Sequence, residues 1–475
     1  MKHWIGALMT GALFALAGCQ DAGGSEDAAS GDDDDRITIN KDPYPSTYEA
    51  ISFNPVLITN AIILDGEGGF IENGSVLMQG GDITAFGADI DIPDDDKLIT
   101  IDAAGKWVTP GIIDNHSHLG VYPSPSVSAH NDGNEISAPV TAEVWSEHGI
   151  WPQDPGFTRA LAGGVTSMQI LPGSANLFGG RGVVLKNVPG RSVQDMKFPG
   201  APYTLKMACG ENPKRVYGYG GGRFPGGAPY SRMGNLAGYR TAWAEAVEYK
   251  RKLDDYLEDG GDPPARNLEL ETLVGVLEGD ILVHMHCYRA DEMVQILDLA
   301  DEFGYEVTSF HHAVESYKIA DRLAEAGVCS SMWADWWGFK MEAYDGVREN
   351  IPMVHDAGAC AIVHSDSDIG IQRLNQEAAK ALSDGRRAGL EISKADAWQW
   401  LSLNPAKSLG VDEQTGSIAP GKDGDVVIWS ADPFSVYAQA EQVFVDGALV
   451  FDRNDPARQP VMDFELGQPG EGDAK

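Results

Sequence analysis

The sequence predicts an α/β fold: a TIM-like (β/α)8 barrel with a small β-sandwich domain formed from both ends of the chain. Between residues 111 and 409, apolar runs of strand length alternate with longer stretches of helical pattern, which is typical of parallel β/α units. On either side of this region, short apolar runs are broken by Gly and Asp, as in antiparallel strands joined by tight turns. About eight β/α units that close on themselves form a barrel, whose chemistry lies at the carboxyl ends of the strands.

The N-terminus carries an export signal. Lys2 and His3 precede an apolar stretch, residues 4–16, that is too short to remain as a membrane span. The run Leu-Ala-Gly-Cys at residues 16–19 resembles a bacterial lipoprotein box, which implies cleavage before Cys19 and acylation of Cys19. Gln20 follows, where aspartate would be associated with inner-membrane retention, so we expect an exported lipoprotein anchored by lipid to the outer membrane, facing the periplasm or the surface. The alternative is an ordinary signal peptide with a chance cysteine.

The net negative charge of the chain argues against anionic partners such as nucleic acid. The 475 residues include 71 acidic and 35 basic side chains, giving a net charge of -36, which repels nucleic acid and anionic headgroups. Residues 21–35 lack large apolar side chains and are expected to form a disordered tether. With 43% hydrophobic residues, the remainder is long enough to bury one large core and a smaller one.

The patterns divide the chain into segments and strands. In order, we expect a signal peptide (1–18), a tether and N-terminal extension (19–52), the first half of the β-sandwich (53–108), the barrel (109–410), the second half of the β-sandwich (411–455) and a tail (456–475). The predicted barrel strands are 111–115, 165–171, 204–209, 281–286, 306–310, 328–332 and 360–364, with 182–186 as a further candidate.

Four cysteines remain beyond Cys19, and they are widely spaced with no C-x-x-C motif: Cys209, Cys287, Cys329 and Cys360. Export would permit disulfides, but we expect buried free thiols that behave as small hydrophobic side chains.

Histidines and an aspartate recur where the predicted strands end. His116 and His118 are spaced i, i+2 and therefore point to the same face of one strand. Neutral imidazole is the commonest metal ligand, but such a pair alone is weak evidence. Three later strand ends carry further candidates, namely His286, the pair His311-His312, and Asp366. Together they indicate a metal site at one mouth of the barrel.

Three motifs resemble the amidohydrolase superfamily, and most closely its imidazolonepropionase-like branch: residues 110–118 (PGIIDNHSH), 404–410 (NPAKSLG) and 416–425 (GSIAPGKDGD). The resemblance covers about residues 55 to 455 and implies hydrolysis of C-N bonds with one or two divalent metals, of which Zn²⁺ is the expected one. It implies that His116, His118, His286, His312 and Asp366 are metal ligands, and that Asp366 is also the catalytic proton shuttle. His284 would lie deeper in the barrel, and His364 would line the site.

The ligand that bridges two metals in such enzymes is either a carboxylated lysine or a glutamate. Residues 205–212 offer both, and we expect Glu211, after a glycine at the strand end, rather than Lys206. The alternatives are a buried barrel lysine and a capping loop residue. The number of metals depends on this choice.

Substrate contacts are harder to assign. Candidate anchors for a substrate are Arg181, Arg223, Tyr288 and Arg289, with Trp333, Trp336 and Trp337 as pocket walls and residues 217–239 as a lid. Ordinary surface salt bridges and packing are the alternatives.

We therefore expect a metal-dependent hydrolase that cleaves an amide, lactam or peptide bond of a small molecule or dipeptide outside the cytoplasm. The competing hypothesis is a non-catalytic surface lipoprotein that uses the same barrel for binding. The oligomeric state stays open, with a homo-oligomer among the options.

Overall fold

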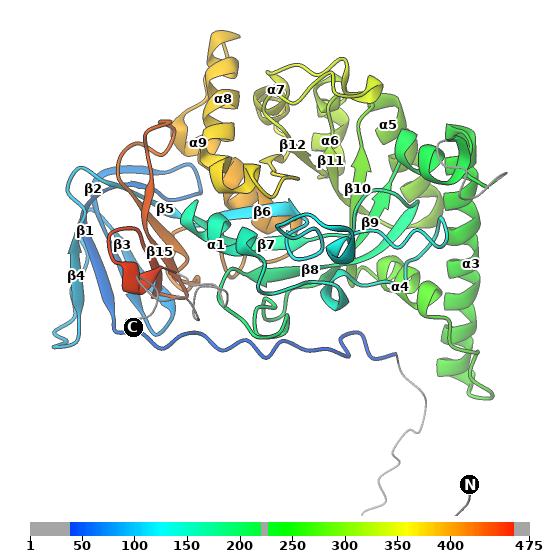
Figure 1. The fold of residues 1–475 in the computed structure, drawn as a ribbon, viewed down its shortest axis with the longest axis horizontal. Coiled ribbons are helices and arrows are strands. Elements are labelled where there is room, and N and C mark those ends of the chain that lie inside the picture. The colour runs from blue at the N-terminus through cyan, green and yellow to red at the C-terminus, as the bar shows by residue number, and fades with distance from the viewer. Residues whose placement is uncertain (1–38, 220–226, 460–475) are drawn as a thin grey trace, which may run out of the picture. The chain divides into compact units, whose positions relative to one another are not determined.

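The computed structural model describes residues 39–219 and 227–459, which form two β-sheets and the helices around them (Figure 1). The signal peptide, Cys19, the tether, Arg223 and residues 460–475 lie outside the described residues. In the part of the chain that is described, no helix combines the length and apolarity needed to cross a bilayer.

One of the two eight-stranded sheets contains the eight predicted barrel strands in sequence order. They are β6 (Ile112–Ser117), β7 (Val165–Ile170), β8 (Phe178–Lys186), β9 (Tyr203–Ala208), β10 (Ile281–Cys287), β11 (Val307–His312), β12 (Cys329–Met332) and β13 (Ala361–Val363). The two edge strands approach each other just past β13, where the Asp366 N–H donates to the His116 carbonyl at 3.0 Å. This near-closed sheet is consistent with the predicted barrel.

One strand departs from the predicted parallel arrangement. β8 pairs antiparallel with both β7 and β9, whereas the other pairs in this sheet are parallel. Only residues 171–177 connect β7 to β8, and a parallel crossover needs a dozen residues or more. The short connection therefore reverses the strand.

Helices occupy most of the other connections between these strands and the segment that follows β13. They are α1 (Pro155–Ala162), α2 (Glu211–Pro213), α3 (Arg232–Asp259), α4 (Leu268–Leu277), α5 (Ala290–Phe303), α6 (Ala320–Ala326), α7 (Asn350–Asp356), α8 (Leu374–Arg387), α9 (Lys394–Trp398) and α10 (Leu403–Ser408). In α5, Met293, Ile296 and Ala300 recur at helical spacing and are buried, so one apolar face lies against the sheet. Gly304 ends α5 in the left-handed conformation, with φ 74°.

The second eight-stranded sheet joins the two ends of the chain. Its strands are β1 (Val56–Leu64), β2 (Phe70–Gln79), β3 (Asp82–Gly87), β4 (Ile99–Asp102), β5 (Trp107–Pro110), β14 (Val426–Trp429), β15 (Ala440–Val445) and β16 (Ala448–Asp452). β5 pairs antiparallel with β14, with Val108 opposite Ile428. Both ends therefore meet in one sheet, as predicted, while its arrangement as a sandwich stays a prediction.

The described part of the N-terminal extension, residues 39–52, is held by polar contacts to the barrel. Lys197 Nζ donates to Asp42 at 2.8 Å and to the Tyr44 carbonyl at 2.7 Å, and the Thr47 N–H donates to the Gln194 carbonyl at 3.0 Å. These contacts fix the extension next to the segment that follows β8.

The cysteine prediction is wrong. Cys209 is bonded to Cys287, and Cys329 is bonded to Cys360. The first bridge joins the chain just after β9 to the end of β10, with Cα atoms 5.2 Å apart. Neighbouring parallel strands brought each pair within bonding range, although the cysteines are far apart in sequence.

A buried lysine connects β8 to the segments next to β14 and β15 of the second sheet. Lys186 is 2% exposed, and its ammonium lies 2.7 Å from Asp423, 3.6 Å from Asp425, and in contact with Asp446. Burial opposes its charge, but the three carboxylates outweigh burial and raise the pKa of Lys186. The carboxylates depend on this cation because they have lost most of their hydration.

Replacing Lys186 with Met is expected to lower the free energy of unfolding by about 3 kcal/mol, since the buried carboxylates lose their cation. Urea denaturation measures the change. Lys106→Met is the control, because Lys106 pairs with Glu441 at the surface and such pairs contribute about 1 kcal/mol or less. Equal stability of the two variants would contradict the assigned role.

Candidate metal centre

Three predicted ligands place one atom each at the corners of a small triangle at the mouth of the barrel. His116 Nε2 lies 3.3 Å from His118 Nε2, and these two nitrogens lie 3.4 and 3.2 Å from Asp366 Oδ1. His116 is in β6, His118 follows it, and Asp366 follows β13. The contact between the edge strands therefore assembles the triangle.

These separations fit a tetrahedral metal ion. Ligand atoms about 2.1 Å from one ion, at tetrahedral angles, lie roughly 3.4 Å from each other. Three electron-rich atoms at this spacing repel one another unless a cation or protons lie between them. The hydrogen bonds of His116 and His118 show which ring nitrogen carries the hydrogen, and therefore whether a proton or a cation lies within the triangle.

His118 exposes a lone pair to the triangle. Its Nδ1 lies 2.8 Å from the carbonyl oxygen of Leu171, which can only accept, so Nδ1 carries the hydrogen. In the neutral ring, Nε2 is then bare and faces Asp366. Binding of a cation is the arrangement that this tautomer favours.

A chain of three imidazoles fixes the tautomer of His116 in the same way. His284 Nε2 lies 3.0 Å from the Ser408 carbonyl, so it is the donor, and His284 Nδ1 accepts from His311 Nε2 at 2.8 Å. His311 Nδ1 then accepts from His116 Nδ1, also at 2.8 Å. The bare atom of His116 is therefore Nε2, at the triangle. We call His284, His311 and the Ser408 carbonyl the imidazole relay.

Burial favours the neutral form of the fully buried histidines of this cluster. It lowers the pKa of His284 and of His364 to about 3, and it lowers the pKa values of His116, His311 and His312 well below the ordinary value. Neutral imidazole is the form that binds metal. The same burial leaves Nδ1 of His286 and of His312 without a hydrogen-bond partner among the described residues.

The backbone is strained where two of the ligands lie. His312, Ala313 and Asp366 have φ of 68°, 36° and 48°, a region that non-glycine residues rarely adopt. The His312 N–H donates to His364 Nε2 at 3.2 Å, so His364 holds this backbone in place. His312 Nδ1 lies 3.8 Å from Asp366 Oδ2. Such strain is typical of functional sites, where surrounding contacts maintain it.

Of the two candidates for the additional ligand, Lys206 contacts the triangle, while the choice between Lys206 and Glu211 stays a prediction. Lys206 is fully buried in β9, and its Nζ lies 3.4 Å from His116 Nε2 and donates to the Pro172 carbonyl at 3.2 Å. Burial lowers the pKa of Lys206 to about 7, so a neutral amine is available for carboxylation. The described residues contain two clusters that could hold a metal ion, namely the triangle and a second cluster of His116, His312 and His364. Glu211 belongs to neither and acts electrostatically on Tyr288 and Lys340.

The other predicted site residues divide into two groups. His286 and Tyr288 lie beside His312, with ring centroids 4.5 and 5.3 Å from it, and Trp333 stacks on His312 at 4.4 Å. Trp336 and Trp337 are 41% and 59% exposed.

Two of the predicted arginines are engaged elsewhere. Arg181 Nε donates to Thr272, and its guanidinium lies 4.2 Å from the Trp145 ring. Arg289 forms a surface ion pair with Asp291 at 2.9 Å. Both guanidinium groups have partners of their own, and substrate binding by either one stays a prediction.

Sequence reasoning missed the imidazole relay. The spacing His284-x-His286 was a usable signal, since it repeats the i, i+2 pattern of His116 and His118. The adjacent pair His311-His312 was another, because consecutive residues of a strand point to opposite faces and would serve different partners.

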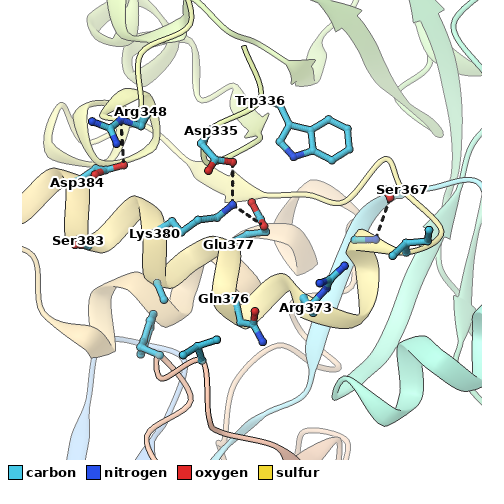
Figure 2. A pocket seen from close by; sticks show the side chains of 15 residues that line it. Asp335, Trp336, Arg348, Ser367, Arg373, Gln376, Glu377, Lys380, Ser383 and Asp384 are labelled. Carbon is cyan, nitrogen blue, oxygen red and sulfur yellow. Dashed lines mark hydrogen bonds and ion pairs between the residues drawn. The ribbon is translucent and has the colours of Figure 1, made fainter. Parts of the chain in front are cut away.

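A hollow of about 830 Å³ lies beside the β13–α8 connection, outside the histidine cluster. Figure 2 shows Lys380 between Asp335 and Glu377, at 2.8 Å from each. The ammonium of Lys380 is therefore already paired with two carboxylates and is not available to bind an anion in this hollow.

Breaking the relay is expected to weaken metal binding. In His284→Leu, His311 loses its acceptor and His116 is no longer held in one tautomer, so zinc affinity should fall by about 10- to 100-fold. Competition with a fluorescent chelator measures this, with the half-exposed His148→Leu as control. A folded His284→Leu protein with unchanged zinc affinity would remove the relay from the site.

Comparison with known proteins agrees with this geometry. A model of the amidohydrolase family matches residues 107–450. The chain is 33% identical over 437 residues to amidohydrolase tasK of Hapsidospora irregularis, which covers 84% of this chain but 43% of that protein. It is 24% identical over 409 residues to an imidazolonepropionase of Agrobacterium fabrum, covering 79% and 88% of the two chains.

A solved structure extends the likeness to the fold. The crystal structure of an amidohydrolase from Thermotoga maritima superimposes with a TM-score of 0.76 at 34% identity, covering 84% of this chain and all of that one. The family match, the relatives and the strand-end histidines all lead to one assignment: the chain belongs to the amidohydrolase family.

Proposed function

We propose that the protein is a metal-dependent hydrolase that cleaves the C-N bond of an amide, lactam or small peptide outside the cytoplasm. The observation that carries the proposal is the triangle of His116 Nε2, His118 Nε2 and Asp366 Oδ1, whose edges of 3.2–3.4 Å match a tetrahedral divalent ion. Zn²⁺ suits this set of nitrogen and oxygen donors.

The ligands would be His116, His118 and Asp366, with His286, His312 and a carboxylated Lys206 available for a second ion. When bound, a divalent ion lowers the pKa of water and polarises the scissile carbonyl. Asp366 would accept the proton of the attacking water and deliver it to the leaving nitrogen. Its second oxygen, Oδ2, is the one that lies toward His312 and is available for this transfer.

The protein environment would keep these groups aligned. The imidazole relay holds His116, and the Leu171 carbonyl holds His118. Trp333 and Tyr288 stack near His312 and limit the access of bulk water. The names of the relatives span imidazolonepropionase, dihydroorotase and 5-methylthioadenosine/S-adenosylhomocysteine deaminase, so the proposal stays at the level of the reaction.

Activity should be measured on a panel of dipeptides, N-acyl amino acids and lactams with the zinc-loaded protein. Hydrolysis of at least one member that stops on chelation and returns with zinc supports the proposal. A folded, metal-free protein that hydrolyses none would favour the second candidate, a surface lipoprotein that uses the barrel only for binding.

Export and lipid anchoring are part of the proposal. The two disulfides support an oxidising compartment, because such bonds are rare in the cytosol of mesophiles. Cys19→Ser should release the protein from the membrane fraction into the soluble fraction, as immunoblotting of fractionated cells would detect. Unchanged membrane association of this variant would exclude anchoring through Cys19.

A further inference from the structure

Lys340 presents a partly buried ammonium group with unused hydrogen-bonding capacity beside the histidine cluster. It lies in the connection between β12 and α7, and its side chain is 16% exposed. Nζ donates to Asn212 Oδ1 at 3.3 Å and lies 3.8 Å from the centroid of the Tyr288 ring. An ammonium has three N–H donors, so a single amide oxygen and a ring face, its close partners among the described residues, leave donor capacity free.

The nearest carboxylate does not satisfy this charge. Glu342 Oε2 lies 3.9 Å from Lys340 Nζ, which is beyond hydrogen-bond range, and it has no hydrogen-bond partner among the described residues. The other oxygen of Glu342 is in contact with the guanidinium of Arg232. Arg232 also pairs with Glu292 at 2.9 Å, so Glu342 shares this guanidinium, and within the described ranges Lys340 has no carboxylate oxygen closer than 3.9 Å.

Two contacts direct Lys340 toward the proposed metal centre. Asn212, which accepts from Lys340, donates through Nδ2 to His286 Nε2 at 3.3 Å. Tyr288, which lies under the ammonium, stacks on His312 with ring centroids 5.3 Å apart. Lys340 is thus linked through Asn212 to the predicted ligand His286, and through the ring of Tyr288 to the predicted ligand His312.

An apolar surface adjoins this cation. Phe339, the preceding residue, is 56% exposed, and its ring lies 5.7 Å from Trp333 and 6.3 Å from Tyr288. A molecule that placed an anion on Lys340 could therefore lay an apolar group against Phe339 while its amide faced His286 and Asp366.

We propose that Lys340 binds a carboxylate of the substrate, so that the site selects amides that carry both a free carboxylate and an apolar side chain. This inference rests on the proposed hydrolase activity and narrows its substrate class. Lys340 is an additional candidate beside the predicted anchors Arg181 and Arg289, whose guanidinium groups already contact Thr272 and Asp291.

The test compares an acid with its amide on the full-length protein. Calorimetry measures the binding of 3-phenylpropanoate and of 3-phenylpropanamide, which have the same apolar arm and differ in charge. We expect the native protein to bind the acid at least about tenfold more tightly, Lys340→Met to lose this preference, and Lys340→Arg to keep most of it. Lys318→Met is the matched control, because Lys318 also lies near a tyrosine ring but pairs with Glu315 at the surface.

Three outcomes would overturn the proposal: no binding of the acid by the native protein, no preference for it, or a preference that survives in Lys340→Met. The last would assign the preference to a metal rather than to the lysine. Because binding needs no turnover, the two proposals fail separately. A Lys340-dependent preference without hydrolysis would reject the hydrolase alone, and hydrolysis without the preference would reject the anchor alone.

Discussion

Replacing Asp366 with Asn is expected to lower kcat by about 10³-fold while metal remains bound. Asparagine keeps an oxygen near His116 and His118 but cannot accept and release a proton at neutral pH. A positioned general acid–base typically contributes 10²- to 10⁴-fold to the rate, which sets the expected size. Steady-state kinetics on a panel substrate, together with metal analysis of the same sample, measure both parts.

Asp368→Asn is the matched control. Asp368 lies two residues further along the same connection, and its carboxylate accepts from Ser124 Oγ at 3.3 Å. It should keep near-native kcat. If Asp366→Asn retained comparable activity, proton transfer would have to be assigned to another residue.

The second large expected effect is a loss of activity that distinguishes Lys206 from Glu211 as the additional metal ligand. Lys206→Met should lose at least about 100-fold in kcat/KM and bind at most one metal ion, because the variant cannot supply an anionic oxygen next to His116. Glu211→Gln should change kcat/KM by only a few fold, since Glu211 belongs to neither ligand cluster in the described ranges. Kinetics and metal counting on both variants measure the difference.

The reverse result is equally informative. A severe loss in Glu211→Gln with a near-native Lys206→Met would restore the glutamate that the sequence alone favoured. Comparison of circular dichroism spectra is needed for both variants, because Lys206 is fully buried and its replacement could also affect folding.

The barrel strands could be predicted because their apolar runs are separated by long helical stretches. The proximity of His116, His118 and Asp366 followed, since parallel strands share one carboxyl end. The antiparallel direction of β8 was missed, although the predicted strands 165–171 and 182–186 leave only residues 172–181 between them, which is too short for a parallel crossover.

The contacts of individual side chains could not be predicted, because they depend on how the strands assemble in the folded sheet. Lys206 lies two residues before the end of β9, and only the assembled sheet shows that its long side chain extends to His116. Both disulfides depend on strands being neighbours, which sequence spacing does not reveal. The role of His311 depends on partners in β6 and β10, so a preference for one histidine of the pair left the other unexplained.

Metal content tests the central claim most directly. Purified protein, dialysed against metal-free buffer, should contain at least one equivalent of a divalent metal by mass spectrometry, and the double variant His116→Asn/His118→Asn should contain less than about a tenth of this. Native protein that hydrolysed an amide without bound metal, or a double variant that kept its full metal content, would contradict the account.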